Sequence, residues 1–112
     1  MEKIYNKLVR DKIPEIIKNN NGKPIARILN NTEYKQELEK KLLEEYHEVL
    51  NTKNTEERIE ELADMLEIIS ALSNLENKKL EDVINVSNIK RDKRGGFEKQ
   101  IFLEKVIESD NK

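Results

Sequence analysis

Cysteine is absent from this chain of 112 residues, which excludes a disulfide framework, a thiolate metal site and a thiol nucleophile. Any bound metal must therefore take oxygen ligands. Long apolar runs are also missing, since none approaches the ~18 residues that span a bilayer. The N-terminus lacks the apolar core of a signal peptide. We therefore expect a soluble, cytoplasmic protein with no membrane partner.

The chain has little net charge, although charged residues are abundant. Lys and Arg number 21 and Asp and Glu number 23, which leaves a formal net charge of -2. A protein that binds nucleic acid through its phosphates usually has a basic excess over the whole domain. The balance therefore predicts no nucleic acid polymer as a partner. Apolar residues recur periodically, which predicts a folded core rather than a disordered chain.

Glycine and proline are scarce, with three and two residues, so long segments can be regular. Residues that favour helices, such as Glu, Lys, Leu and Ile, dominate these segments. We predict a mainly α fold in one domain that covers residues 1–112. Thr32 and Thr55, each followed by Glu, are expected to cap helices. The expected helices cover residues 12–20, 32–50, 55–75 and 79–93.

The two longest predicted helices are joined by only four residues, 51–54, which makes them antiparallel neighbours in a helical bundle. Each carries an apolar stripe with helical spacing. The stripe residues are Leu38, Leu42, Tyr46 and Val49 on the first helix, and Ile59, Leu62, Leu66 and Ile69 on the second. Two short apolar segments, near residues 24–29 and 100–107, predict a small two-stranded β element, although the second also fits a helix loosely.

Acids on these two helices are the most informative residues. Surface helices usually place Glu four residues before Lys, because opposite charges attract at that spacing. Here Glu44 precedes Glu48, and Glu60 precedes Asp64, by four residues. Each like-charge pair costs about 0.2 to 0.5 kcal/mol when uncompensated. Mg²⁺ seeks oxygen ligands and also binds phosphates, so the pattern predicts a metal with a phosphorylated ligand; alternatively, the acids simply face water.

The acids also form a spaced motif, Glu44-Glu45-x-x-Glu48, then twelve residues, then Glu61-x-x-Asp64. It resembles the EExxE…ExxD motif of the MazG-like superfamily of all-α nucleoside triphosphate pyrophosphohydrolases, which includes the phosphoribosyl-ATP pyrophosphohydrolases. Two other segments, YNKLVRDKIPEII and KRDKRGGF, resemble a bacterial and archaeal branch with predicted house-cleaning roles. The resemblance therefore spans most of the chain.

The resemblance implies Mg²⁺-dependent hydrolysis, with Mn²⁺ as a substitute, of a nucleoside triphosphate to the monophosphate and pyrophosphate. Noncanonical nucleotides are included among the expected substrates. Either Glu44 or Glu48 is expected to orient the attacking water, and Glu44 otherwise has a supporting role. The resemblance also implies a homodimer or homotetramer. The residues that match metal ligands are Glu45, Glu48, Glu61 and Asp64.

Basic residues in the two other matching segments are expected to bind the triphosphate, Arg as a bidentate fork and Lys as a point charge. Alternatively they only keep the surface soluble, or Arg10 forms a structural ion pair with Asp11. His47 falls on the side of its helix opposite Glu45 and Glu48, so we expect it to face solvent. The candidate phosphate ligands are Lys7, Arg10, Lys12, Lys90, Arg91 and Arg94.

Two other functions remain open at this stage. The same chemistry could act on phosphoribosyl-ATP in histidine synthesis. The chain could also be a non-catalytic helical interaction module whose acids bind a basic partner or a structural cation.

Overall fold

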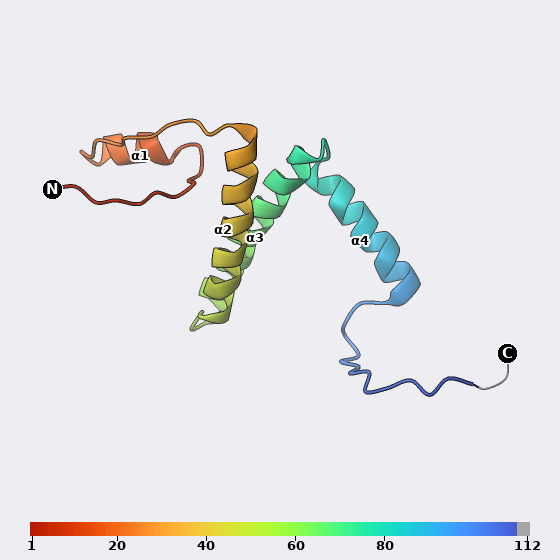
Figure 1. Cartoon of the computed structure of the whole chain (residues 1–112). Helices are drawn as coiled ribbons and strands as arrows, with labels where there is room; N and C mark the ends of the chain where they lie inside the picture. The colour runs from red at the N-terminus through yellow and green to blue at the C-terminus, as the bar shows by residue number, and fades with distance from the viewer. Residues whose placement is uncertain (110–112) are drawn as a thin grey trace. The chain divides into compact units, whose positions relative to one another are not determined.

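The structure is a computed structural model that describes residues 1–109. It contains four helices over these residues and no strand (Figure 1). The mainly α prediction is confirmed, and every predicted helix boundary lies within one residue of the observed one. No helix in the described part has the length and apolar character that crossing a membrane requires. The helices are α1 (Ile13–Asn19), α2 (Asn31–Leu50), α3 (Thr55–Leu75) and α4 (Leu80–Arg94).

The chain divides into two compact units, Met1–Leu80 and Glu81–Lys112. The first contains α1, α2 and α3. The second contains almost all of α4 and the segment that follows it. Each of residues 81–109 is exposed, so this stretch has no buried core of its own. The single domain over residues 1–112 stays a prediction.

Asparagine side chains begin the two long helices. Asn30 accepts a hydrogen bond from the Glu33 backbone N–H at 2.8 Å, and Asn54 accepts one from that of Glu57 at 2.9 Å. The predicted capping residues, Thr32 and Thr55, were therefore wrong. The N–H groups that need a side-chain acceptor are those of Glu33 and Glu57. A capping side chain reaches the N–H three residues further along, so the caps are Asn30 and Asn54, one or two residues before the predicted threonines.

Within residues 1–80, α2 and α3 pack against each other, and the short segment 51–54 connects them (Figure 1). Leu38 and Val49 of α2 and Ile68 of α3 are the buried apolar residues of this contact. Arg58 closes the connection by donating a hydrogen bond from Nη1 to the Val49 carbonyl at 3.2 Å. The predicted α2 stripe is thus confirmed at Leu38 and Val49, whereas Tyr46 is exposed.

The buried side of α3 differs from the predicted one. Leu62 and Leu66 of the predicted stripe are exposed, as is Ile59. The side that faces α2 instead carries Ile68, together with Met65, which is half-buried. The reason is that α3 has two apolar stripes offset by one residue, about 100° around the helix. Periodicity detects both stripes but does not choose between them.

The hairpin of α2 and α3 therefore keeps an exposed apolar face. Each residue of this face follows an inward-facing position by one residue, and in antiparallel helices that rotation leads to the same side of the pair. The acids Glu44, Glu48 and Asp64 each precede an inward-facing position and lie on the opposite side. The apolar face consists of Leu43, Tyr46, Leu50, Ile59, Leu62 and Leu66, all of them exposed.

The predicted β element is not present. Residues 24–29 and 100–107 form no strand. The isoleucines are exposed, with Ile25 at 87% and Ile101 at 81%. A two-stranded element is only marginally stable unless a third strand or a helix packs against it.

Candidate metal centre

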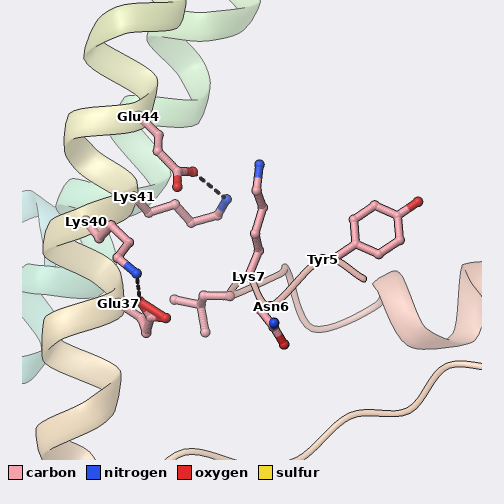
Figure 2. A pocket seen from close by; sticks show the side chains of 8 residues that line it. Tyr5, Asn6, Lys7, Glu37, Lys40, Lys41 and Glu44 are labelled. Atoms are coloured by element: carbon pink, nitrogen blue, oxygen red, sulfur yellow. Dashed lines mark ion pairs between the residues drawn. The ribbon is translucent and has the colours of Figure 1, made fainter. Parts of the chain in front are cut away.

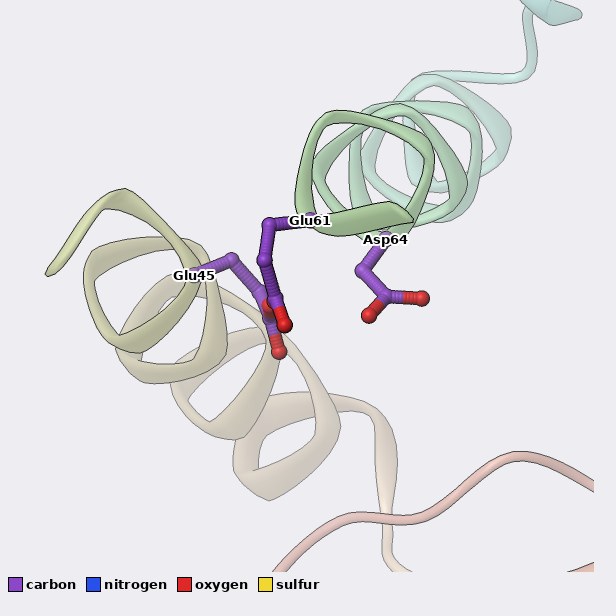
Figure 3. A group of neighbouring side chains, drawn as sticks. All are labelled: Glu45, Glu61 and Asp64. Carbon is purple, nitrogen blue, oxygen red and sulfur yellow. The ribbon is translucent and has the colours of Figure 1, made fainter. Parts of the chain in front are cut away.

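Three carboxylates from the two long helices meet at one side of the hairpin. Glu45 projects from α2, and Glu61 and Asp64 project from successive turns of α3 (Figure 3). One oxygen of each lies within 4.8 Å of the others, and all three side chains are half-buried. Glu45 and Glu61 lie on the helix sides that face each other, so the packing of α2 on α3 brings the group together.

The Glu45 carboxylate is partly buried and, in the described part of the chain, lacks a compensating positive charge or hydrogen-bond donor at one oxygen. Its Oε2 atom is buried and has no hydrogen-bond partner among the described residues. Burial in the contact raises the pKa of Glu45 to about 7. A hydrogen bond to the Glu61 carboxyl, which Glu45 can make only when one of the two is protonated, and the negative charges of Asp64 and Glu61 also raise it, while Lys41 lowers it. Such a site favours either a bound proton or a cation.

The donor set fits a hard divalent cation such as Mg²⁺. Mg²⁺ prefers carboxylate oxygens and usually keeps several of its waters, so three protein oxygens are enough to hold it. A cation here would also satisfy the buried oxygen of Glu45. Of the four predicted ligands, the structure brings together Glu45, Glu61 and Asp64.

Glu48, the fourth predicted ligand, is not part of this group. It is exposed, because it lies one residue before Val49, which faces α3. Glu44 is half-buried and forms an ion pair with Lys41, at 3.9 Å between Oε2 and Nζ. His47 is exposed, as its position on the helix predicted.

Arg10 binds one of the three carboxylates. Its Nη2 atom donates a hydrogen bond to Asp64 Oδ1 at 2.7 Å. The ion pair considered from the sequence, with Asp11, is therefore replaced by a pair with a residue 54 positions away. The contact brings the segment that precedes α1 to the acidic side of α3.

A small cavity of about 100 Å³ lies between the same N-terminal segment and α2 (Figure 2). Lys7 lines it together with Lys40 and Lys41 of α2. Lys40 pairs with Glu37 at 3.3 Å. Lys41 lies one helical turn before Glu45, and this spacing is the sequence signal that would have marked it as a cation beside the acids. The remaining lining residues are Tyr5, Asn6, Leu8, Glu37 and Glu44.

The other predicted phosphate ligands have separate surroundings. Lys12 precedes α1 and is exposed. In the second unit, Lys90, Arg91 and Arg94 occupy the end of α4 and are exposed. Arg91 is already engaged, since it forms an ion pair with Glu98 across Gly96.

Two glycines shape the end of α4. The Gly95 N–H donates to the Arg91 carbonyl at 2.8 Å, and Gly95 has a φ of +84°, a conformation that suits glycine after a helix. A Cβ at Gly96 would meet only the ends of the Arg91 and Glu98 side chains, which can move aside. The positive φ of Gly95 therefore accounts for a glycine directly after α4 without a ligand.

Comparison of the chain with protein-family models, with curated proteins and with solved structures gives no match.

Proposed function

We propose that this chain is a nucleoside triphosphate pyrophosphohydrolase that uses Mg²⁺, with Mn²⁺ as a substitute. The observation that carries the proposal is the convergence of Glu45, Glu61 and Asp64, with one oxygen of Glu45 buried and unpartnered. The MazG-like motif supplies the reaction class, which is hydrolysis to a monophosphate and pyrophosphate in a house-cleaning role. Noncanonical nucleotides are among the proposed substrates.

Bound Mg²⁺ would lower the pKa of a water and screen the phosphate charges. Glu45, Glu61 and Asp64 would hold the ion. Glu48 is our choice for the residue that orients the water, because Glu44 is held in an ion pair with Lys41. The exposed carboxylate of Glu48 lies one turn further along α2, on the side that carries the acids, and can accept a proton from a water there.

The cations beside the carboxylates would bind the outer phosphates. Lys7 lines the cavity next to Glu44, and Arg10 already lies at Asp64. Arg can hold a phosphate with two parallel hydrogen bonds, whereas Lys acts as a point charge. Lys12 of the first unit and Lys90, Arg91 and Arg94 of the second stay predictions from the sequence as phosphate ligands, and Arg91 is paired with Glu98.

The test is pyrophosphate release from a panel of standard and modified nucleoside triphosphates and phosphoribosyl-ATP, with Mg²⁺ or Mn²⁺. Asp64→Asn and Glu48→Gln should each lower turnover by roughly 100-fold or more. Glu39→Gln is a matched control, since Glu39 is an exposed acid of α2 outside the carboxylate group. Equal turnover in all four proteins would contradict the assignment. Turnover of phosphoribosyl-ATP alone would favour histidine synthesis.

A non-catalytic interaction module is the remaining alternative. It is supported if the protein binds Mn²⁺ through the three carboxylates but releases no pyrophosphate from any nucleotide. In that case the loss of a single acid should change metal binding without changing any reaction.

We also propose that the chain forms a homodimer or homotetramer through the apolar face of the hairpin. Leu62 at 45% and Leu43 at 58% exposure belong to the apolar face on the side away from the acids. A second copy would bury this surface and leave the carboxylates accessible. Light scattering after gel filtration should give a multiple of 13.2 kDa, and Leu62→Glu should reduce it to one chain. A wild-type mass of one chain would contradict the proposal.

A further inference from the structure

The positively charged guanidinium of Arg10 lies beside the carboxylates that are proposed to bind the metal. Its guanidinium contacts Asp64 Oδ1 at 2.7 Å, and Asp64 belongs to the group of three carboxylates. The two side chains are 56% and 42% exposed, so the pair is accessible to solvent and to ions. Arg10 is therefore the counter-ion of Asp64 in the metal-free protein.

This counter-ion satisfies the site only in part. A guanidinium is planar and presents its N–H donors in a fixed fork. It therefore cannot bind three oxygens that converge on one point, as a small divalent ion does. Oε2 of Glu45 remains buried without a partner although Arg10 is in place. Two positive charges beside one carboxylate also repel each other. The metal and Arg10 therefore compete for Asp64.

We propose that Arg10 is a substrate-binding residue that metal binding displaces from Asp64 and thereby makes available to the substrate phosphates. The inference rests on the proposed metal centre and adds an order to it, in which the divalent ion binds first and the phosphate-binding guanidinium follows. Arg10 lies three residues after Lys7, which lines the cavity beside Glu44. The displaced guanidinium therefore stays close to Lys7, another proposed phosphate ligand of the same unit.

The arginine side-chain Nε–H signals in a ¹H–¹⁵N spectrum test the exchange directly, because the chain has only five arginines. Arg10→Lys assigns the Arg10 signal by its disappearance. Mg²⁺ should shift this signal as the site fills. Arg27, paired with Glu33 at 3.0 Å, and Arg91, paired with Glu98, are internal controls for general screening of ion pairs and should not shift with it. Asp64→Asn should move the Arg10 signal without metal.

Mn²⁺ affinity, measured from the electron paramagnetic resonance signal of free Mn²⁺, provides a second readout that does not depend on turnover. Arg10→Ala should bind Mn²⁺ roughly two- to fivefold more tightly, the range expected from removing one exposed ion pair. Arg27→Ala removes another exposed, paired guanidinium of the same unit and should leave the affinity unchanged.

The outcomes separate the exchange from the metal centre. The exchange would be overturned, and the metal centre left intact, if Mn²⁺ binds but Mg²⁺ does not move the Arg10 signal. Equal Mn²⁺ affinity in wild type and Arg10→Ala would have the same meaning. A wild-type protein that binds no Mn²⁺ would overturn the metal centre itself. The wild-type Mn²⁺ titration decides the metal centre even if a variant folds poorly, and Arg10→Lys, which keeps the positive charge, is needed only to assign the signal.

Discussion

Glu45 of α2 and Glu61 of α3 face each other across the contact between the two helices, where Leu38, Val49 and Ile68 are buried nearby along the same seam. Two neighbouring carboxylates in a half-buried seam weaken a helical hairpin unless a proton or a cation lies between them. The protonation of this pair and its response to metal ions are therefore the most direct tests of the proposed site.

The metal-free protein should lose stability as the pH rises from about 4.5 to 7. The folded pKa of Glu45 is about 7, above its ordinary value of 4.5. The folded state therefore keeps a proton that the unfolded chain has released, and the stabilisation is complete only below the unfolded pKa. Urea unfolding at several pH values measures the effect. Glu45→Gln should flatten the dependence, whereas Glu48→Gln should retain it; a flat wild-type profile would contradict the pKa.

Mg²⁺ should stabilise the protein at pH 7.5. A ligand at 100 times its dissociation constant contributes about 2.7 kcal/mol when it binds the folded state alone. Thermal unfolding with and without Mg²⁺ measures the shift in the unfolding temperature. Protein freed of divalent ions with a chelator is the reference. Asp64→Asn and Glu61→Gln should remove most of it. Glu48→Gln should keep it, and a lost shift in that variant would restore Glu48 as a metal ligand.

Ile68→Ala should destabilise the hairpin by about 2 to 5 kcal/mol, because it leaves a cavity in the contact between α2 and α3. Ile68 is only 6% exposed, whereas Leu66 on the same helix is 48% exposed. Leu66→Ala is therefore the matched control and should cost less in the single chain. Chemical denaturation at low protein concentration compares them, and the reverse order of stability would show that the predicted α3 stripe is the packed one.

Asn54→Ala should cost about 1 kcal/mol through the loss of the α3 cap. The Asn54 side chain accepts the Glu57 N–H, while Thr55 is the first residue inside the helix. Thr55→Ala should consequently have little effect on the urea midpoint. Equal losses in the two variants would indicate that both residues cap the helix.

The helix ranges could be predicted from the sequence because the signals that start and stop a helix are local. The packed side of α3 could not, because Leu66 and Met65 belong to apolar stripes that differ by one residue and only the partner helix selects between them. The acids were predictable as a group, and Glu45, Glu61 and Asp64 do meet. The contact between Arg10 and Asp64 joins positions 54 residues apart, and nothing in the local pattern indicates such a pair.

The two facing glutamates imply a trade-off that selection would have to maintain. Leucine or methionine at positions 45 and 61 would extend the apolar seam that Leu38, Val49 and Ile68 begin, and replacing buried charged groups by apolar ones of similar volume is often stabilising. Selection of random variants for higher stability should therefore yield apolar substitutions of Glu45 and Glu61 early. If the seam holds the proposed cation, keeping both carboxylates exchanges stability of the metal-free protein for metal binding.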